Sequence, residues 1–259
     1  LAMIAAAALA REGDKRLKTL TLLAAQGDFT EAGEMMLFVS ESTVPFLENM
    51  MWDKGYLDTK QMAGSFQMLR SYDLILSKMV QDYMHGASRG MIDLLAWNAD
   101  ATRMPYKMHS EYLEKLFLNN DFAAGRFTVE GHHVAAENIH VPTFAVSTEK
   151  DHVAPWPSVY KTHLMINGDI VFVLTKGGHN AGIVSEPGHK GRAYRIREHQ
   201  NKSPYLGPEQ WLEAAEKHDG SWWLAWHAWL AKHSSVKRVA ARTVDESLPE
   251  APGSYVLQK

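Results

Sequence analysis

The sequence predicts an α/β protein whose mainly parallel sheet is interrupted by a long helical insertion. Three apolar runs rich in leucine and β-branched residues predict buried strands: residues 17–25, 141–147 and 169–175. Residues 158–165, between the last two runs, have helical spacing, and strand–helix–strand is the unit of a parallel sheet. Residues 40–127 show no strand-like alternation and are rich in Met, Leu and aromatic residues, which favours helices.

The composition fits a globular protein with one large core and no strong overall charge. The chain has 259 residues, of which 46% are apolar, and its 27 basic residues nearly balance 30 acidic ones. Nothing therefore favours a nucleic acid as partner. The chain has no cysteine, so disulfides and thiolate metal sites are excluded within it, and we expect a cytoplasmic location.

The opening residues 1–10 are apolar on every side and predict a helix that ends at the sequence Arg11-Glu12-Gly13. This helix has no capping residue and no acidic first turn, so we interpret it as a helix entered midway. The tail of a secretory signal is the alternative, although the basic segment of such signals is missing. Ten residues are too few for a transmembrane helix, which needs about 20.

Within the insertion, residues 104–119 predict a helix that starts near Pro105 and packs as a cap on the core. Its expected apolar face consists of Met108, Tyr112, Leu113, Leu116 and Phe117.

The chain after residue 186 is polar and predicted to be rich in loops, and two helices follow at 208–217 and 221–233. The last helix carries four tryptophans, which predict a core seam, with a polymer-contacting surface as the alternative: Trp222, Trp223, Trp226 and Trp229. We divide the chain into core (1–39), cap insertion (40–127), core (128–234) and tail (235–259).

Two chemically active residues follow the second and third predicted strands. Asp151 begins the string DHVAPW, and His179 lies in GGHNAG. Catalytic groups gather beyond the carboxyl ends of such strands, and acid before histidine is the order of the α/β-hydrolase pattern. A histidine base needs an acceptor on its second ring nitrogen, and we predict that Asp151 supplies it. The alternative is a turn-starting Asp and a loop His.

Five separated motifs together resemble class I polyhydroxyalkanoate synthases. They are DHVAPW (151–156), GGHNAGIVSEPGH (177–189), WNADATRMP (97–105), MMWDKGYLDTKQMAG (50–64) and GSWWLAWHAWL (220–230). The resemblance covers the whole chain and implies an α/β-hydrolase fold with a helical cap. It also implies polymerisation of (R)-3-hydroxyacyl-CoA, with 3-hydroxybutyryl-CoA as the expected substrate, and release of CoA. A homodimer and association with the surface of cytoplasmic polyester granules are further implications.

In this resemblance, Asp151 corresponds to the triad acid and His179 to the general base. The nucleophile of the family is a cysteine in a Gly-x-Cys-x-Gly-Gly turn, which we expect a few residues before Leu1, outside this sequence. Its thiolate would attack the thioester, and His179 would later activate a 3-hydroxyl for chain extension. We therefore expect the 259 residues alone to be inactive, and we expect no metal or other cofactor.

Further polar residues have weaker assignments. His152 is expected to order the loop beside the acid, with a second base or ligand as the alternative. The cluster of His132, His133 and His140 predicts a solvent-facing hairpin and no metal site.

Arg192 and Arg195 lie in a basic segment, residues 188–202, for which a solvated surface is the usual interpretation, with contact to the phosphates of CoA as the alternative. Trp97, Asn98 and Asp100 help to close the site or serve in packing and capping.

Two other functions remain open from the residues. A serine-type α/β-hydrolase, an esterase or depolymerase, would share the acid and the histidine. A non-catalytic granule-surface protein of the same fold would explain why the chain lacks both cysteine and Gly-x-Ser-x-Gly. The sequence before Leu1 discriminates among them.

Overall fold

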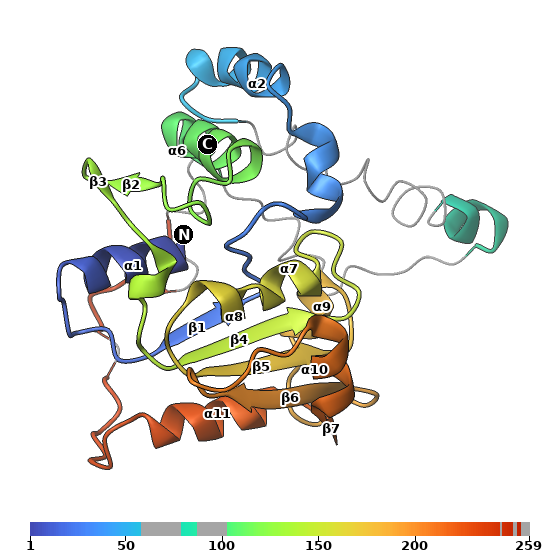
Figure 1. Cartoon of the computed structure of the whole chain (residues 1–259). Helices are drawn as coiled ribbons and strands as arrows, with labels where there is room; N and C mark the ends of the chain where they lie inside the picture. Colours follow the sequence, from blue (N-terminus) through green and yellow to red (C-terminus); the bar gives the residue numbers. More distant parts are fainter. Residues whose placement is uncertain (58–78, 87–102, 244, 251–252, 255–259) are drawn as a thin grey trace.

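The computed structural model describes residues 1–57, 79–86, 103–243, 245–250 and 253–254 (Figure 1). Five strands form one sheet in the order β1-β4-β5-β6-β7. They are β1 (Leu20–Leu23), β4 (Thr143–Thr148), β5 (Ile170–Thr175), β6 (Ala193–His199) and β7 (Glu216–Asp219). The first three are parallel, and β6 and β7 are antiparallel. The predicted α/β class is confirmed.

The sheet corrects several expectations from the sequence. Residues 193–199 were predicted as loop, but they form β6, the longest strand of this sheet. The helix predicted over 208–217 ends at Ala214, because the next residues form β7. The first strand is shorter than predicted and is not buried on both faces, since Leu23 is 44% exposed.

One face of the sheet is covered by α11 (Trp223–Lys232), which lies below the strands in Figure 1. A buried cluster lies between the sheet and this helix and consists of Phe144, Val146, Val173 and Trp222. The indole Nε1 of Trp226 donates a hydrogen bond of 3.1 Å to Thr21 Oγ1 on β1. The tryptophans therefore form a core seam, as predicted.

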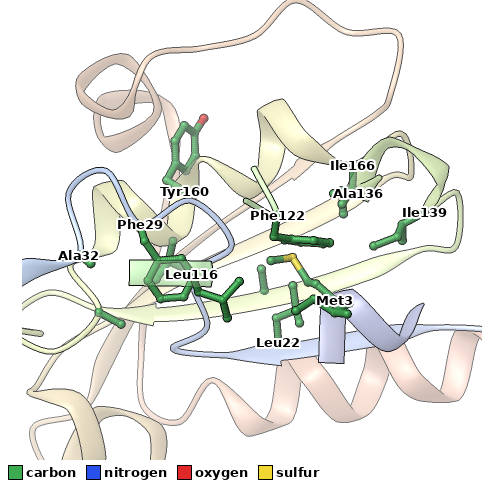
Figure 2. Close-up of a cluster of buried hydrophobic side chains, with 14 of the residues drawn as sticks. Met3, Leu22, Phe29, Ala32, Leu116, Phe122, Ala136, Ile139, Tyr160 and Ile166 are labelled. Carbon is green, nitrogen blue, oxygen red and sulfur yellow. The ribbon is translucent and has the colours of Figure 1, made fainter. Parts of the chain in front are cut away.

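The other face packs against α1 (Ala2–Arg11), α7 (Trp156–Tyr160), α8 (Thr162–Met165) and α10 (Pro208–Ala214). The alanines of α1 leave room for close packing, and Met3 and Leu22 meet Leu116 of the insertion in the main core (Figure 2). This core joins the sheet to the insertion.

The described part of the insertion contains only helices and turns, apart from one isolated bridge between Tyr56 and Pro105. Its helices are α2 (Thr43–Trp52), the π-helix η3 (Val80–Met84), α6 (Tyr106–Glu111) and the π-helix η4 (Tyr112–Leu118). The 3-10 helix η1 (Gly33–Phe38) precedes the insertion. The proposed boundaries at 39/40 and 127/128 stay a prediction. Trp97, Asn98 and Asp100 lie outside the described residues.

The buried face of the α6–η4 helix differs from the predicted one. Leu113, Leu116 and Phe117 are buried as expected, but Met108 is 36% exposed. His109 and Ser110 are buried in its place. His109 lies four residues before Leu113, so the two share a helical face.

Three short elements complete the chain. The hairpin of β2 (Thr128–Val129) and β3 (His132–His133) leads into the 3-10 turn η5 (Ala136–Asn138), and α9 (His179–Ile183) follows β5. In the portion of the chain described above, no helix has the length and apolar character to cross a lipid bilayer.

Candidate active site

The two predicted catalytic residues meet at the carboxyl ends of neighbouring strands. β4 and β5 run parallel, and their last residues, Thr148 and Thr175, are paired in register. The loops that follow therefore start side by side. His179 Nδ1 lies 2.8 Å from Asp151 Oδ2.

Four hydrogen bonds hold the Asp151 carboxylate in place. Oδ1 accepts the backbone N–H groups of Val153 (2.9 Å) and Ala154 (2.8 Å). Oδ2 accepts the Thr148 hydroxyl at 3.3 Å in addition to the histidine. Burial raises the pKa of Asp151, but the hydrogen bonds from His179 and from the loop amides outweigh it, so the pKa lies below its ordinary value.

An ionised Asp151 determines the tautomer of the histidine. A carboxylate only accepts hydrogen bonds, so His179 Nδ1 carries a proton and donates it. Nε2 is then the nitrogen that can accept a proton from a reacting group. Nε2 makes no hydrogen bond to any residue that the structure describes. Asp151 thus both starts a turn and orients the histidine.

Two glycines allow the loop after β5 to hold His179 close to the sheet. Gly177 has φ +130°, which favours glycine. Gly182, in α9, packs directly on β4: a Cβ there would lie 2.5 Å from Thr148 Cγ2. The helix that begins with His179 is therefore packed against the residue that hydrogen-bonds Asp151.

His179 lies on the wall of a pocket of about 360 Å³. The sheet side of the pocket comes from the start of α1 and the loops after β1 and β4, and the opposite side comes from the α6–η4 helix. Most of the lining is apolar, and it includes Leu1, Met3, Ala24, Phe29, His109, Tyr112, Leu113 and Ala154. The arrangement places a base beside a hydrophobic chamber.

The other predicted residues lie outside this pocket. His152 is half-buried, and its backbone carbonyl accepts a hydrogen bond from the Glu34 N–H at 3.2 Å, which links the acid's loop to η1. Its side-chain role stays a prediction. His132 and His133 are exposed on β3, and no three His, Asp or Glu side chains gather as a metal site in the described ranges.

Arg192 and Arg195 do not line the pocket, and the middle of the basic segment forms β6. Arg195 Nη1 donates to the Leu212 carbonyl at 2.8 Å, and Arg197 Nη1 to the Ala214 carbonyl at 3.3 Å. Arg195 and Arg197 thus stabilise the C-terminal end of α10. Arg192 Nη2 donates to the Val184 carbonyl at 3.2 Å, beyond α9.

The pocket contains a second histidine that was not among the predicted site residues. His109 is 6% exposed, and its Nδ1 is buried without a hydrogen-bond partner in the described structure. The sequence signal was weak, because a histidine on an apolar helix gives no indication of the face on which it lies.

The chain is similar to several polymerases over nearly its whole length. No family model matches it. It is 40% identical over 255 residues to the poly(3-hydroxyalkanoate) polymerase of Methylorubrum extorquens and 38% identical over 255 residues to the poly(3-hydroxyalkanoate) polymerase subunit PhaC of Rhizobium etli. It is 33% identical over 265 residues to the corresponding subunit of Cupriavidus necator.

These matches cover 96–98% of this chain but 39–44% of each relative, so the chain spans about two fifths of their length. The resemblance inferred from the motifs is confirmed: the chain is homologous to part of the poly(3-hydroxyalkanoate) polymerases.

Proposed function

We propose that these residues provide the acid and the base of the active site of a longer polyhydroxyalkanoate polymerase. That enzyme, called the full polymerase below, joins (R)-3-hydroxyacyl groups from CoA thioesters, with 3-hydroxybutyryl-CoA as the expected substrate, into a polyester. The observation that carries the proposal is the 2.8 Å contact of His179 Nδ1 with an ionised Asp151 on the wall of an apolar pocket. The relatives are poly(3-hydroxyalkanoate) polymerases, which supports polyester formation, and the motif resemblance supplies the CoA thioester as substrate.

The proposed chemistry has two steps that use the same base. A cysteine thiol from another part of the full polymerase gives its proton to His179 Nε2, and the sulfur attacks the acyl carbonyl. CoA leaves as the thiolate and takes up that proton. The 3-hydroxyl of a second acyl unit then gives its proton to Nε2 and attacks the acyl–cysteine, which forms an ester and frees the cysteine. Both steps proceed without a metal or another cofactor.

Asp151 contributes through the imidazole in both steps. Its negative charge stabilises the imidazolium that forms when Nε2 accepts a proton. Because two loop amides hold its other oxygen, the carboxylate keeps its place while the ring changes charge. Preorganised charge of this kind lowers the barrier without a reorganisation cost.

We further propose that the full polymerase is a cytoplasmic homodimer that binds the surface of polyester granules. The resemblance supplies this expectation. Its structural support is the exposure of three large apolar side chains on η1 and α2: Leu37, Phe46 and Trp52. Exposed apolar side chains supply the contact area of a protein–protein or polymer interface.

The reaction is tested in the full polymerase by exchanging His179 for glutamine. We expect CoA release from (R)-3-hydroxybutyryl-CoA, followed with a thiol reagent, to fall by at least about 10³-fold, as loss of a triad base does. His227→Gln, at an exposed histidine on α11 that does not line the pocket, is the matched control and keeps full activity. A His179→Gln enzyme with near-normal turnover contradicts the proposal.

Product analysis separates the polymerase from a hydrolase of the same fold. A polymerase with a cysteine nucleophile forms polyester and is inactivated by iodoacetamide. A serine-type esterase releases free hydroxy acid and survives the reagent. The 259-residue chain by itself is expected to release no CoA.

The contact of Arg192 and Arg195 with the CoA phosphates also stays a proposal. It is supported by their charge and by the position of Arg192 beside α9, the helix that carries His179. Exchange of both for alanine should raise the apparent KM for acyl-CoA without changing kcat. An unchanged KM would contradict this role.

A further inference from the structure

His109 is a polar group placed where an apolar one would pack more easily. Its side chain lines the same pocket as His179 but from the opposite side, on α6. The rest of the pocket's lining from this helix is aromatic or aliphatic, from Tyr112, Leu113, Leu116 and Phe117. A hydrogen-bonding atom that is buried there without a partner destabilises the fold.

The histidine is held in a defined orientation. The His109 backbone N–H donates to the Pro105 carbonyl at 2.9 Å. The next residue, Ser110, donates its hydroxyl hydrogen to Glu48 Oε1, which ties α6 to α2. The ring therefore sits on a helix that is tied to α2, and binding sites on such supports are precise.

The ring is neutral in the folded protein. Burial lowers the pKa of His109 below its ordinary value, and no acidic partner counteracts this among the described residues. A neutral imidazole has one N–H donor and one nitrogen acceptor. It can bind a hydroxyl or an ester oxygen in an apolar chamber without the cost of burying a charge.

We infer that His109 is a specificity-determining residue that hydrogen-bonds the oxygen on C3 of the bound acyl group. The inference rests on the proposed function. A 3-hydroxyacyl thioester has two polar positions: its carbonyl, which must lie beside the nucleophile and His179, and the oxygen on C3. The apolar lining accommodates the carbon chain, and His109 is a polar side chain of the lining, beside Tyr112 and Gln26, that can receive that second oxygen.

This assignment gives the pocket a means of rejecting acyl groups without a C3 oxygen. Such a ligand would offer the His109 ring no oxygen to bond in the pocket. A site built to bond a polar group discriminates strongly against an analogue that lacks it. The bound hydroxyl would also be held in a fixed position for the later extension step.

The test compares the first turnover of the full polymerase with (R)-3-hydroxybutyryl-CoA and with butyryl-CoA. The readout is the ratio of the two second-order rate constants for CoA release. His109→Phe should lower this ratio about tenfold, since it removes one hydrogen bond to the substrate oxygen. His109→Asn keeps a hydrogen-bonding side chain at this position and should retain most of the preference.

The matched control is His163→Phe. His163 is also buried, and its Nε2 has no described partner, but it does not line the pocket, so the ratio should stay unchanged. His109→Met replaces the Phe variant if circular dichroism shows that the latter does not fold.

An unchanged ratio in a folded apolar variant overturns the assignment of His109. If the unmodified enzyme released CoA from neither substrate, the proposed function itself would fail. The two failures are therefore distinguishable.

Discussion

Asp151→Asn exchanges one carboxylate oxygen for an amide nitrogen and should separate the two chemical steps. The amide oxygen can still accept the Val153 and Ala154 N–H groups, so the loop keeps its fold. The new NH₂ then faces His179 Nδ1, where two donors cannot meet. The ring must therefore turn to the other tautomer, with its proton on Nε2, and it can no longer act as a base.

The magnitude differs between the two steps. Reversal of the histidine tautomer in a serine-type triad costs about 10⁴ in rate, or about 5 kcal/mol. A cysteine with an ordinary pKa near 8.5 is still about a tenth ionised at pH 7.5, so acylation should lose only about tenfold. The 3-hydroxyl has no comparable ionised fraction at this pH, so its attack depends on the base. Steady-state polymerisation should therefore fall about 10³- to 10⁴-fold.

Stopped-flow CoA release from (R)-3-hydroxybutyryl-CoA measures the first turnover, and polymer formation measures the steady state. The first turnover of the variant should recover as the pH rises to about 9, because the free thiol then ionises. The matched control is Asp169→Asn, at an exposed aspartate before β5 that accepts the Asn201 N–H at 3.0 Å. Equal losses in both phases, or a loss below tenfold in the steady state, would refute the reasoning.

Three further predictions concern the supporting structure, each measured by urea unfolding of the full polymerase. Gly182→Ala should cost about 1–3 kcal/mol and lower turnover, because its Cβ would strike Thr148 Cγ2 at 2.5 Å; Gly178→Ala, whose nearest contact is 3.7 Å away, should be tolerated. Trp222→Ala should cost about 3–5 kcal/mol, since this side chain is 1% exposed and donates to the Gly182 carbonyl at 3.1 Å; Leu224→Ala, at an exposed site of α11, should change stability by less than about 0.5 kcal/mol. Burial lowers the pKa of His163 from 6.5 to about 4, so the unfolded chain takes up this proton at a higher pH than the folded chain does. About 3 kcal/mol of stability that is present above pH 6.5 should therefore be lost as the pH falls to about 4. His163→Phe should remove that loss, and an unchanged pH slope would contradict the assignment.

The pairing of Asp151 with His179 was predictable because it depends on topology alone. Each residue follows an apolar strand, and adjacent parallel strands bring their carboxyl ends together. The hydrogen bonds that place the carboxylate were not predictable. They depend on how the loop over 151–154 turns, and short strings do not specify this.

The error over β6 has a physical cause. Its residues alternate, with Tyr194 and Ile196 packed toward α11 and Arg195 and Arg197 reaching the end of α10. The sequence did not reveal this period-2 pattern, because it does not distinguish arginines that donate to helix carbonyls from arginines that face solvent. The burial of His109 in place of Met108 was also not predictable. The helix continues as the π-helix η4, and π-helical turns change the residue spacing from which a buried face is predicted.

The pairing of β1 with β4 has a consequence for the synthesis of the chain. Leu20 pairs with Thr143, so the whole insertion must be made between the two strands. At the usual pace of a ribosome this takes on the order of ten seconds. Throughout that time β1 and the apolar residues of α1 emerge without the strand that covers them. Nascent chains of this protein should therefore be bound by chaperones that recognise apolar segments, and the catalytic centre can form only after β4 and β5 have been made.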